Sequence, residues 1–521
     1  MGWNVFLVKD LGDFQTPDAL VAKVLEAINF SGQRWSRGLE PTCGKGNFVR
    51  GLLKAPIPPR EIIGYELQIT HLAEAQKIRA DATRIDIRQA NIFDIDFRHD
   101  LRWHETGPLL VIGNPPWVTN AALGILNSNN LPEKQNIKNL RGMDARTGAS
   151  NFDIAEYIWL KLIRELLHEA EITLALLCKT TTARNVLQFA YDTHLPLASA
   201  SIHKIAAKLW FNADVDACLF QMQFGGSDTY HAKPKSGYDV PVYAALESTE
   251  IERVIGFVDG QLVANVADYS TRSSDSLPSI LDWRQGLKHD AASIMELEYR
   301  DGKLRNKLGE AVDVEPDYVY PLLKGSDLFR QTRIQPRRSV IVTQQKVRED
   351  TTNIEYKAPK LWRYLTEHSS FFEKRKSSIY TNQPHFAMFG VGEYSFAEYK
   401  VAVAGLYKRP YFRALAAFNH RPIMLDDTCY FVPCKTPEQA ALLASLLNQP
   451  EATNVINALV FTDSKRPITK KVLQRIDIFA LLEQVNQQTL LVKASQEIKS
   501  LSGQRTENYW SKPLENILAG F

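Results

Sequence analysis

A short polar and aromatic loop, Asn114-Pro115-Pro116-Trp117, follows a run of four apolar residues at 109–112 and one glycine. Such a run suits a buried parallel strand, and open α/β sheets bind their ligands at the carboxyl ends of the strands. An aromatic exocyclic amine is a poor nucleophile because its lone pair is delocalised into the ring, so a site that uses it must accept both N–H hydrogens as the nitrogen becomes tetrahedral. The side-chain carbonyl of Asn114 and the main-chain carbonyl of Pro115, which Pro116 restrains, can accept these hydrogens, and Trp117 offers a face on which a planar base can stack. The loop therefore predicts a site that activates the amine of a planar base.

This loop resembles the catalytic motif (D/N/S)PP(Y/F/W) of the amino-group DNA methyltransferases, in the NPPW form that is typical of adenine-N6 enzymes. The resemblance implies that Asn114, Pro115, Pro116 and Trp117 are catalytic and that Trp117 stacks on the target base. Protein-glutamine methyltransferases and some RNA methyltransferases carry NPPY, and a proline-rich turn can follow any strand. The tetrapeptide alone leaves these alternatives open.

Composition places the chain among ordinary globular proteins of two or three domains, since 45% of its 521 residues are hydrophobic and 23% are charged. We expect a cytoplasmic protein without membrane association, because the start of the chain lacks the features of a signal peptide and no apolar run reaches about 18 residues. The net charge of only +3 means that any nucleic-acid surface must be local. The cysteines form neither a CxxC pair nor a cluster with histidines, which predicts a reducing compartment and no metal site; they are Cys43, Cys178, Cys218, Cys429 and Cys434.

A glycine-rich segment at residues 38–48 looks like the cofactor loop (D/E)PxxGxGxF of the gamma-class adenine methyltransferases, whose cofactor is S-adenosylmethionine. Glycines let the main chain pass close to a ligand, and an acidic residue at the end of a strand can accept a hydrogen bond from the methionine ammonium. A second strand ends in Glu66 about twenty residues later, the position expected to bind ribose hydroxyls. A dinucleotide is disfavoured because the GxGxxG spacing is missing. The resemblance assigns Glu40, Thr42, Cys43, Gly44 and Glu66 to the cofactor.

Two flanking segments extend the resemblance. Thr16 reads as the N-cap of a helix at 19–28, and the same xTP pattern precedes the cofactor loop in gamma-type enzymes, where it helps to hold the amino-acid end of the cofactor.

Asn91 stands where relatives usually have the Asp that binds the adenine amine of the cofactor, with Ile92 against the ring and Asp94 as a second candidate. The Asn91 carbonyl can accept the same bond, and we expect Asn91→Asp to be tolerated or to strengthen binding. Asn114 is expected to contact the cofactor as well as the target amine.

The segment between residues 118 and 150 is polar and long, so it predicts either a loop that closes over DNA or an extruded base, or a surface insertion. A helix is expected at 152–168, a strand at 172–178 and a helix at 183–191. Phe211, or its neighbour Trp210, precedes a strand at 215–224. In the resembled family an aromatic residue there stacks on the opposite face of the extruded adenine from the catalytic-loop aromatic, although both residues could equally be core residues.

Composition changes near residues 225–228, which predicts a catalytic domain at 1–225 and a DNA target-recognition domain with C-terminal helices at 226–521. The expected fold class is α/β: a doubly wound, Rossmann-like methyltransferase domain followed by a mixed α/β recognition domain with a helical C-terminal segment at 437–447 and 468–500. Residues 318–328 resemble a segment that recurs in the recognition region of these enzymes. Basic and aromatic residues suited to phosphate and base contacts interleave in this half; the basic ones are Arg330, Arg333, Arg337, Arg338, Lys346, Arg348, Lys374, Arg375, Lys376, Lys408, Arg409, Arg413, Lys465 and Arg466.

Taken together, the motifs predict a site-specific methyltransferase that moves a methyl group from S-adenosylmethionine to the N6 amine of adenine in double-stranded DNA, by base flipping and direct transfer. No Pro-Cys nucleophile loop accompanies the cofactor and catalytic motifs, since the Pro-Cys pair of the chain, Pro433-Cys434, lies more than 300 residues after them, and this disfavours cytosine-C5 methylation. No PD-(D/E)xK nuclease module is seen, so the chain is expected to modify DNA without cutting it, which leaves room for a cognate restriction endonuclease as a separate partner. Two alternatives remain open: a methyltransferase of RNA or of protein glutamine, and a non-catalytic subunit of a DNA-modification complex that keeps the fold.

Overall fold

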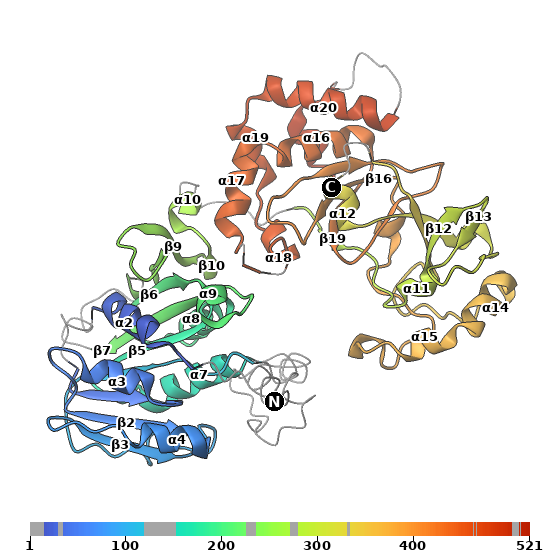
Figure 1. Ribbon diagram of the computed structural model, residues 1–521. Coiled ribbons are helices and arrows are strands. Elements are labelled where there is room, and N and C mark those ends of the chain that lie inside the picture. Colours follow the sequence, from blue (N-terminus) through green and yellow to red (C-terminus); the bar gives the residue numbers. More distant parts are fainter. Residues whose placement is uncertain are drawn as a thin grey trace. The chain divides into compact units, whose positions relative to one another are not determined.

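The computed structural model of the protein describes residues 15–29, 35–118, 153–225, 236–270, 280–330, 334–461, 463–464, 466–502, 510 and 512–521. The chain divides into two compact units, Met1–Ala267 and Asp268–Phe521, which are coloured from blue to green and from green to red in Figure 1. The polar segment expected to close over DNA lies almost wholly outside the described residues, since 119–152 are not described.

The first unit is built on one large sheet. Its strands are β1 (Arg37–Glu40), β2 (Glu61–Glu66), β3 (Arg84–Gln89), β4 (Leu109–Gly113), β5 (Glu171–Lys179), β6 (Leu197–Ile205), β7 (Ala217–Gly225), β8 (Val240–Tyr243), β9 (Ile251–Val258) and β10 (Gln261–Val263). Within the described part of the chain their order is β10-β9-β8-β6-β7-β5-β4-β1-β2-β3. The central strands β3, β2, β1, β4 and β5 are parallel, whereas β7 is antiparallel to both β5 and β6.

Helices cover both faces of this sheet, as expected for parallel strands that are apolar throughout. They are α2 (Asp18–Ala27), α3 (Asn47–Leu53), α4 (Ile69–Ala75), α7 (Ile154–Leu166), α8 (Thr180–Asp192) and α9 (Ala207–Phe211), with the 3-10 turn η2 (Ser236–Tyr238) and α10 (Val266–Ser270) further on. Leu110 and Ile112 of β4 join the cluster of apolar side chains that includes α2 and α3. Leu109 and Val111 point to the other face and are equally inaccessible, with 0% exposure. The doubly wound α/β fold predicted for this part of the chain is confirmed.

The first unit extends further than the predicted boundary at 225/226, because three more strands join its sheet. Strand β8 pairs with β6 in parallel, and β9 and β10 continue the sheet beyond it. The Tyr238 hydroxyl lies 2.9 Å from the Ala190 carbonyl oxygen and 2.8 Å from that of Leu195. The composition change near residues 225–228 therefore falls inside this unit, and the division lies at Ala267/Asp268.

The second unit is a mixed α/β structure with two sheets and a helical end, as predicted. A five-stranded sheet has the order β13-β12-β15-β14-β18, and a four-stranded sheet has the order β11-β19-β16-β17, in the part of the chain that the structure describes. The strands are β11 (Arg284–Gln285), β12 (Glu296–Arg300), β13 (Lys303–Arg305), β14 (Val319–Leu323), β15 (Arg338–Ile341), β16 (Tyr399–Ala404), β17 (Arg413–Leu415), β18 (Met424–Leu425) and β19 (Cys429–Cys434).

The expected C-terminal helical segment is formed by several helices. The predicted helix at 437–447 is α16 (Pro437–Leu447), whose N-cap Thr436 accepts from Gln439 N. The segment expected at 468–500 is divided into α18, α19 and α20. The helical elements of this unit are α11 (Ala292–Met295), η3 (Pro316–Tyr318), α12 (Gly325–Arg330), α13 (Ile354–Lys357), α14 (Pro359–Glu367), α15 (Ser369–Glu373), η4 (Ser378–Tyr380), η5 (Glu393–Phe396), α16, α17 (Pro450–Leu459), α18 (Lys470–Leu473), α19 (Ile478–Gln484), α20 (Gln487–Ser502) and α21 (Leu514–Leu518). None of the described helices has both the length and the apolar character needed to cross a membrane.

Candidate active site

A pocket of about 380 Å³ lies at the carboxyl ends of the parallel strands of the first unit. Nearly all of the residues predicted to bind the cofactor or the target amine line it: Thr16, Glu40, Thr42, Cys43, Gly44, Glu66, Asn91, Ile92, Asn114 and Pro116. Pro115 and Trp117 are not among its lining residues. The pocket thus joins the cofactor loop after β1, the acid that ends β2, the turn after β3 and the catalytic loop after β4.

The cofactor loop depends on two glycines with a left-handed backbone conformation. Gly44 has φ of 53° and Gly46 has φ of 79°, values that favour glycine. A Cβ atom added at Gly44 would lie only 2.6 Å from Oε1 of Gln15. The loop is also tied to β2, because Cys43 N donates to the Tyr65 carbonyl at 2.8 Å. These constraints keep the main chain of the loop at the wall of the pocket.

Glu66 uses both carboxylate oxygens to fix the loops around it. One oxygen accepts from Gly44 N at 2.7 Å and the other from Gln68 N at 2.7 Å. Each oxygen keeps a further lone pair, because a carboxylate can accept about four hydrogen bonds. Glu66 can therefore hold the loop and still accept from ligand hydroxyls.

Glu40 lies deeper, below the start of helix α3. Its side chain is only 2% exposed and accepts from Val49 N at 3.2 Å. Burial raises the pKa of the Glu40 carboxyl well above its usual value, and the nearby Glu66 charge raises it further, although the bond from Val49 N acts in the opposite direction. A cationic ligand group beside Glu40 would favour its ionised form.

The helix after Thr16 begins differently from the prediction. Helix α2 has Pro17 as its N-cap, and no side chain caps it. Thr16 is therefore not the N-cap: it is buried at the pocket wall, where its carbonyl accepts from Asn47 Nδ2 at 2.5 Å. The helix is held instead by the Pro17 carbonyl, which accepts from the Leu20 and Val21 amides.

The turn after β3 places Asn91 at the pocket with its side chain already engaged. Its Oδ1 accepts from Phe93 N at 3.3 Å, and its Nδ2 donates to Asp94 Oδ2 at 3.1 Å. Asn91, Ile92 and Phe93 line the pocket, whereas Asp94 does not. Position 91 thus lacks the carboxylate that relatives have there, but the side chain of Asn91 is hydrogen-bonded to the carboxylate of Asp94.

In the catalytic loop, Asn114 lies at the pocket and Trp117 lies in the core. Trp117 is 8% exposed, and its Nε1 donates to the Leu177 carbonyl at 3.2 Å. The rings of Trp117 and Phe211 meet edge to face, with centroids 5.3 Å apart and an interplanar angle of 78°. A base could stack between these two rings only if they first separated, so the predicted stacking pair is not preformed. Trp210 packs against the same apolar cluster.

Two features of the site were missed by the sequence analysis. Gln15, the first residue of the xTP pattern, covers Gly44, accepts from Lys45 N at 3.0 Å and lies 3.4 Å from the His71 ring. Asp153 and Lys179 form an ion pair of 2.8 Å at the carboxyl end of β5. An Asp just before a helix could have suggested the cap that Asp153 provides, but no local pattern points to its pairing with Lys179.

The order of the central strands, the antiparallel β7 between β5 and β6, and a ligand-sized pocket at the carboxyl ends define a class I methyltransferase domain. The chain is similar to the Type IIL restriction-modification enzyme MmeI, solved in complex with DNA: the TM-score is 0.52 with 13% identity, over 96% of this chain and 74% of that one. It is 36% identical over 475 residues to the Type II methyltransferase M.NspV of Nostoc sp., which covers 91% of this chain and 97% of the relative. No protein-family model matches the chain.

The chain therefore belongs to the Type II methyltransferases of restriction-modification systems. It is a DNA methyltransferase, and S-adenosylmethionine is its cofactor. The pocket fits such a ligand: Glu66 keeps acceptor capacity for hydroxyls, the buried Glu40 suits a cationic group, and the glycine loop lets a ligand approach the main chain. Among the residues that the structure describes, no group of His, Cys, Asp or Glu side chains could hold a metal ion.

Proposed function

We propose that the protein is a site-specific, gamma-class adenine-N6 DNA methyltransferase. The observation that carries this proposal is the position of Asn114, which lines the same pocket as the cofactor-loop residues. An acceptor for the target amine thus borders the space that the methyl donor would fill. Family membership favours DNA over RNA or protein glutamine as the acceptor.

In the proposed reaction, the target adenine leaves the duplex, because its amine cannot reach the pocket while it is stacked and paired. When bound, S-adenosylmethionine supplies an electrophilic methyl group on a sulfonium sulfur. Asn114 Oδ1 and the Pro115 carbonyl would accept the two N–H hydrogens, which would leave the lone pair of the amine nitrogen free to take the methyl group that the sulfonium sulfur gives up. The methylated nitrogen is positive until it releases a proton to water, and the same two acceptors stabilise that charge. Trp117, after separating from Phe211, would stack on the base.

The cofactor would be held along the pocket by residues from four segments. We assign the ribose hydroxyls to Glu66 and the adenine to Asn91 and Ile92. The amino-acid end is assigned to the loop after β1 and the segment before α2, with Thr16, Glu40, Thr42, Cys43 and Gly44. A cognate restriction endonuclease that reads the same DNA sequence is the expected partner of such an enzyme.

Asn114→Ala tests the catalytic assignment. Removing one preorganised acceptor should lower the single-turnover rate of methyl transfer by a factor of about 10²–10³, while cofactor and DNA affinities stay close to those of the unchanged protein. Asn516→Ala, an exposed asparagine on α21, is the control and should retain the full rate.

Analysis of the modified nucleosides separates the remaining possibilities. N6-methyladenine supports the proposal, whereas N4-methylcytosine would keep the catalytic loop but overturn the adenine assignment. Near-normal transfer by Asn114→Ala would show that the loop is not catalytic. Absence of transfer to any DNA by the unchanged protein would favour a non-catalytic subunit.

A further inference from the structure

The second unit carries an exposed surface in which aromatic and basic side chains alternate. We call it the α12 platform, and it comprises the end of α12 and the loop between β16 and β17: Phe329, Arg330, Leu406, Tyr407, Lys408, Arg409 and Tyr411. Phe329 and Tyr407 are stacked in parallel, with ring centroids 4.0 Å apart and an interplanar angle of 10°. Phe329 is 36% exposed, Leu406 39% and Tyr411 42%. A stacked aromatic pair at the surface is a ready contact for a partner.

The cations of the platform are available to an anionic partner. Arg330, Lys408 and Arg409 are exposed, and within the described residues none of them is ion-paired to a carboxylate. Arg413 behaves differently, because its Nε donates to the Leu328 carbonyl at 3.0 Å and its guanidinium lies 4.1 Å from the Tyr411 ring centroid. Arg413 therefore joins the loop to the helix, while the three exposed cations keep their charge free for a partner.

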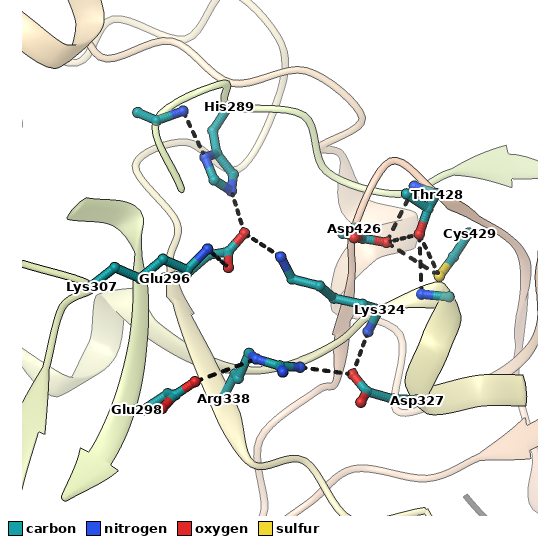
Figure 2. A network of polar contacts seen from close by, with 12 residues as sticks. His289, Glu296, Glu298, Lys307, Lys324, Asp327, Arg338, Asp426, Thr428 and Cys429 are labelled. Carbon is teal, nitrogen blue, oxygen red and sulfur yellow. Dashed lines mark hydrogen bonds and ion pairs between the residues drawn. The ribbon is translucent and has the colours of Figure 1, made fainter. Parts of the chain in front are cut away.

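A network of polar contacts fixes the start of α12 (Figure 2). Lys324, the residue before the helix, donates its ammonium to Glu296 Oε1 at 2.7 Å and its main-chain N–H to Asp327 Oδ2 at 2.9 Å. Gly325 N donates to Thr428 Oγ1 at 3.0 Å, and Arg338 Nη1 lies 3.3 Å from Asp327 Oδ2. The helix is therefore tied both to β12 and to the turn between β18 and β19.

Glu296 is the centre of this network and is only 4% exposed. Burial by itself would raise the pKa of its carboxyl, but hydrogen bonds from Lys307 and Lys324 outweigh it and lower the pKa. Burying charges carries a large desolvation penalty that offsets much of their mutual attraction. The Glu296 carboxylate is compensated by two ammonium groups, those of Lys307 at 2.8 Å and Lys324 at 2.7 Å. The strands beneath it are equally fixed, since β14 and β18 pair in parallel at Leu322 with Met424 and at Leu323 with Leu425.

We propose that the α12 platform is a duplex-DNA contact surface of this methyltransferase. Arg330, Lys408 and Arg409 would bind backbone phosphates, and the Phe329–Tyr407 stack would lie against sugars and base edges in the adjacent groove. The proposal rests on the proposed role of the second unit in recognising DNA. The proposal also assigns a role to residues 318–328. This segment would position helix α12, whose end carries contact residues, and would not itself contact the bases.

The charge contribution can be measured with Lys408→Ala/Arg409→Ala in the full-length protein, by titration of a fluorescent mixed-sequence DNA duplex at several salt concentrations. Each lost phosphate contact lowers the salt slope by about 0.9, so the slope should fall by about 1.8 and the affinity by about 60-fold at 0.1 M salt. Lys303→Ala/Lys357→Ala, two exposed lysines elsewhere in the unit, is the matched control and should leave both quantities unchanged. Equal losses in both double variants, or none in the first, would overturn the proposal.

The stacked rings are tested separately with Phe329→Ser. Because Phe329 carries no charge, the affinity should fall by about tenfold at every salt concentration, the scale of truncating an aromatic contact residue at an interface, while the slope remains constant. Cofactor affinity should be normal in all variants. A weaker affinity for an acidic peptide than for DNA is expected, and the reverse order would reject DNA as the ligand. DNA binding and methyl transfer are measured independently, so the two proposals can fail separately. A platform variant with normal DNA binding would contradict only the assignment of the α12 platform to DNA. An unchanged protein that binds DNA without methylating it would contradict only the proposed function.

Discussion

Glu40 is a buried acid whose charge state should respond to the cofactor. Its raised pKa means that the folded protein holds this proton more tightly than the unfolded chain does. Stability is therefore lost as the pH rises from the ordinary carboxyl pKa through the raised one, and Glu40→Gln should remove that loss. A ligand ammonium near Glu40 would favour the carboxylate, so cofactor binding should release a proton and strengthen as the pH rises.

We predict that Glu40→Gln binds S-adenosylmethionine about 10- to 100-fold more weakly, because a charge-assisted bond is worth about 1.5–3 kcal/mol. Calorimetry in buffers of different ionisation enthalpy should find fewer protons released by this variant than by the unchanged protein. Denaturant titrations at mildly acidic and at neutral pH should show a flatter pH dependence of its unfolding free energy. Equal proton release by both proteins would remove Glu40 from the cofactor contact.

Asn91 and Asp94 act as one hydrogen-bonded pair, which changes the expectation for position 91. An Asp at 91 would stand about as far from the Asp94 carboxylate as the Asn91 amide now does, at 3.1 Å, so repulsion would oppose the benefit of a charged acceptor. The exchange Asn91→Asp/Asp94→Asn keeps one carboxylate, one amide and their hydrogen bond.

We therefore predict that the exchanged pair binds S-adenosylmethionine at least as tightly as the original and more tightly than Asn91→Asp alone. Asp94→Asn completes a double-mutant cycle, and the coupling between the two positions should be about 0.5–3 kcal/mol. Calorimetric titration of the four proteins supplies this value. If Asn91→Asp alone gave the tightest binding, the pairing would not control the cofactor contact.

At the scale of elements, the Asp153–Lys179 pair connects helix α7 with strand β5 beside the catalytic loop. Asp153 Oδ1 accepts from Ala155 N at 3.0 Å as the N-cap of α7, and the Ile154 amide donates to the Val118 carbonyl at 3.0 Å. The Trp117 indole is attached to the same strand end through the Leu177 carbonyl. The side chains of Asp153 and Lys179 are only 12% and 21% exposed, so solvent screens this pair little.

We predict that Lys179→Met lowers the single-turnover methylation rate by about 10²-fold, because a displacement of the reacting groups by about 1 Å can have an effect of that size. The affinity for the cofactor should change much less. Lys179→Arg should restore most of the rate. Lys204→Met is the control, because the Lys204–Glu252 pair is more exposed, at 37% and 39%, and such pairs contribute little. A normal rate for Lys179→Met would show that the pair does not position the loop.

At the scale of the whole molecule, each unit has its own buried core, and the entire candidate active site lies in the first. We predict that a fragment of residues 1–267 folds and binds S-adenosylmethionine with the affinity of the full chain. It should methylate DNA poorly, because the proposed recognition surface is in the second unit. Calorimetry and a methyl-transfer assay on plasmid DNA test the two statements.

A fragment of residues 1–225 is the matched comparison for the domain boundary. It lacks Tyr238, Val240, Val242 and Ile255, which are between 0% and 6% exposed in the full chain. Their loss would expose the side chains of α8 and β6 that they cover, and each large apolar side chain that loses its burial costs about 1.5–3 kcal/mol, so this fragment should unfold at a clearly lower denaturant concentration than 1–267. Equal stability would return the boundary to 225/226.

The sequence by itself determined the doubly wound fold of the first unit up to residue 225 and, together with the family resemblance, the residues of its pocket. The fold follows from local rules: an apolar run predicts a buried strand, and the polar or glycine residues after it lie at the strand's carboxyl end. Parallel strands bring those ends together, so Glu40, Glu66, Asn91 and Asn114 could be assigned to one pocket from their places in the chain.

Only the tertiary structure decided which contacts these residues and the basic clusters make. Trp117 follows one predicted strand and Phe211 precedes another. Their edge-to-face contact could not be predicted, because it depends on how the two strands are packed. Arg375 looked like one more basic surface residue, but it donates to the carbonyls of His385 and Ala387 inside the second unit. Lys408, which also stands in a basic cluster, is exposed. Sequence patterns report the chemical type of a side chain and the element that carries it. They do not report which distant carbonyl or carboxylate folding brings within hydrogen-bonding distance, because that depends on long-range packing.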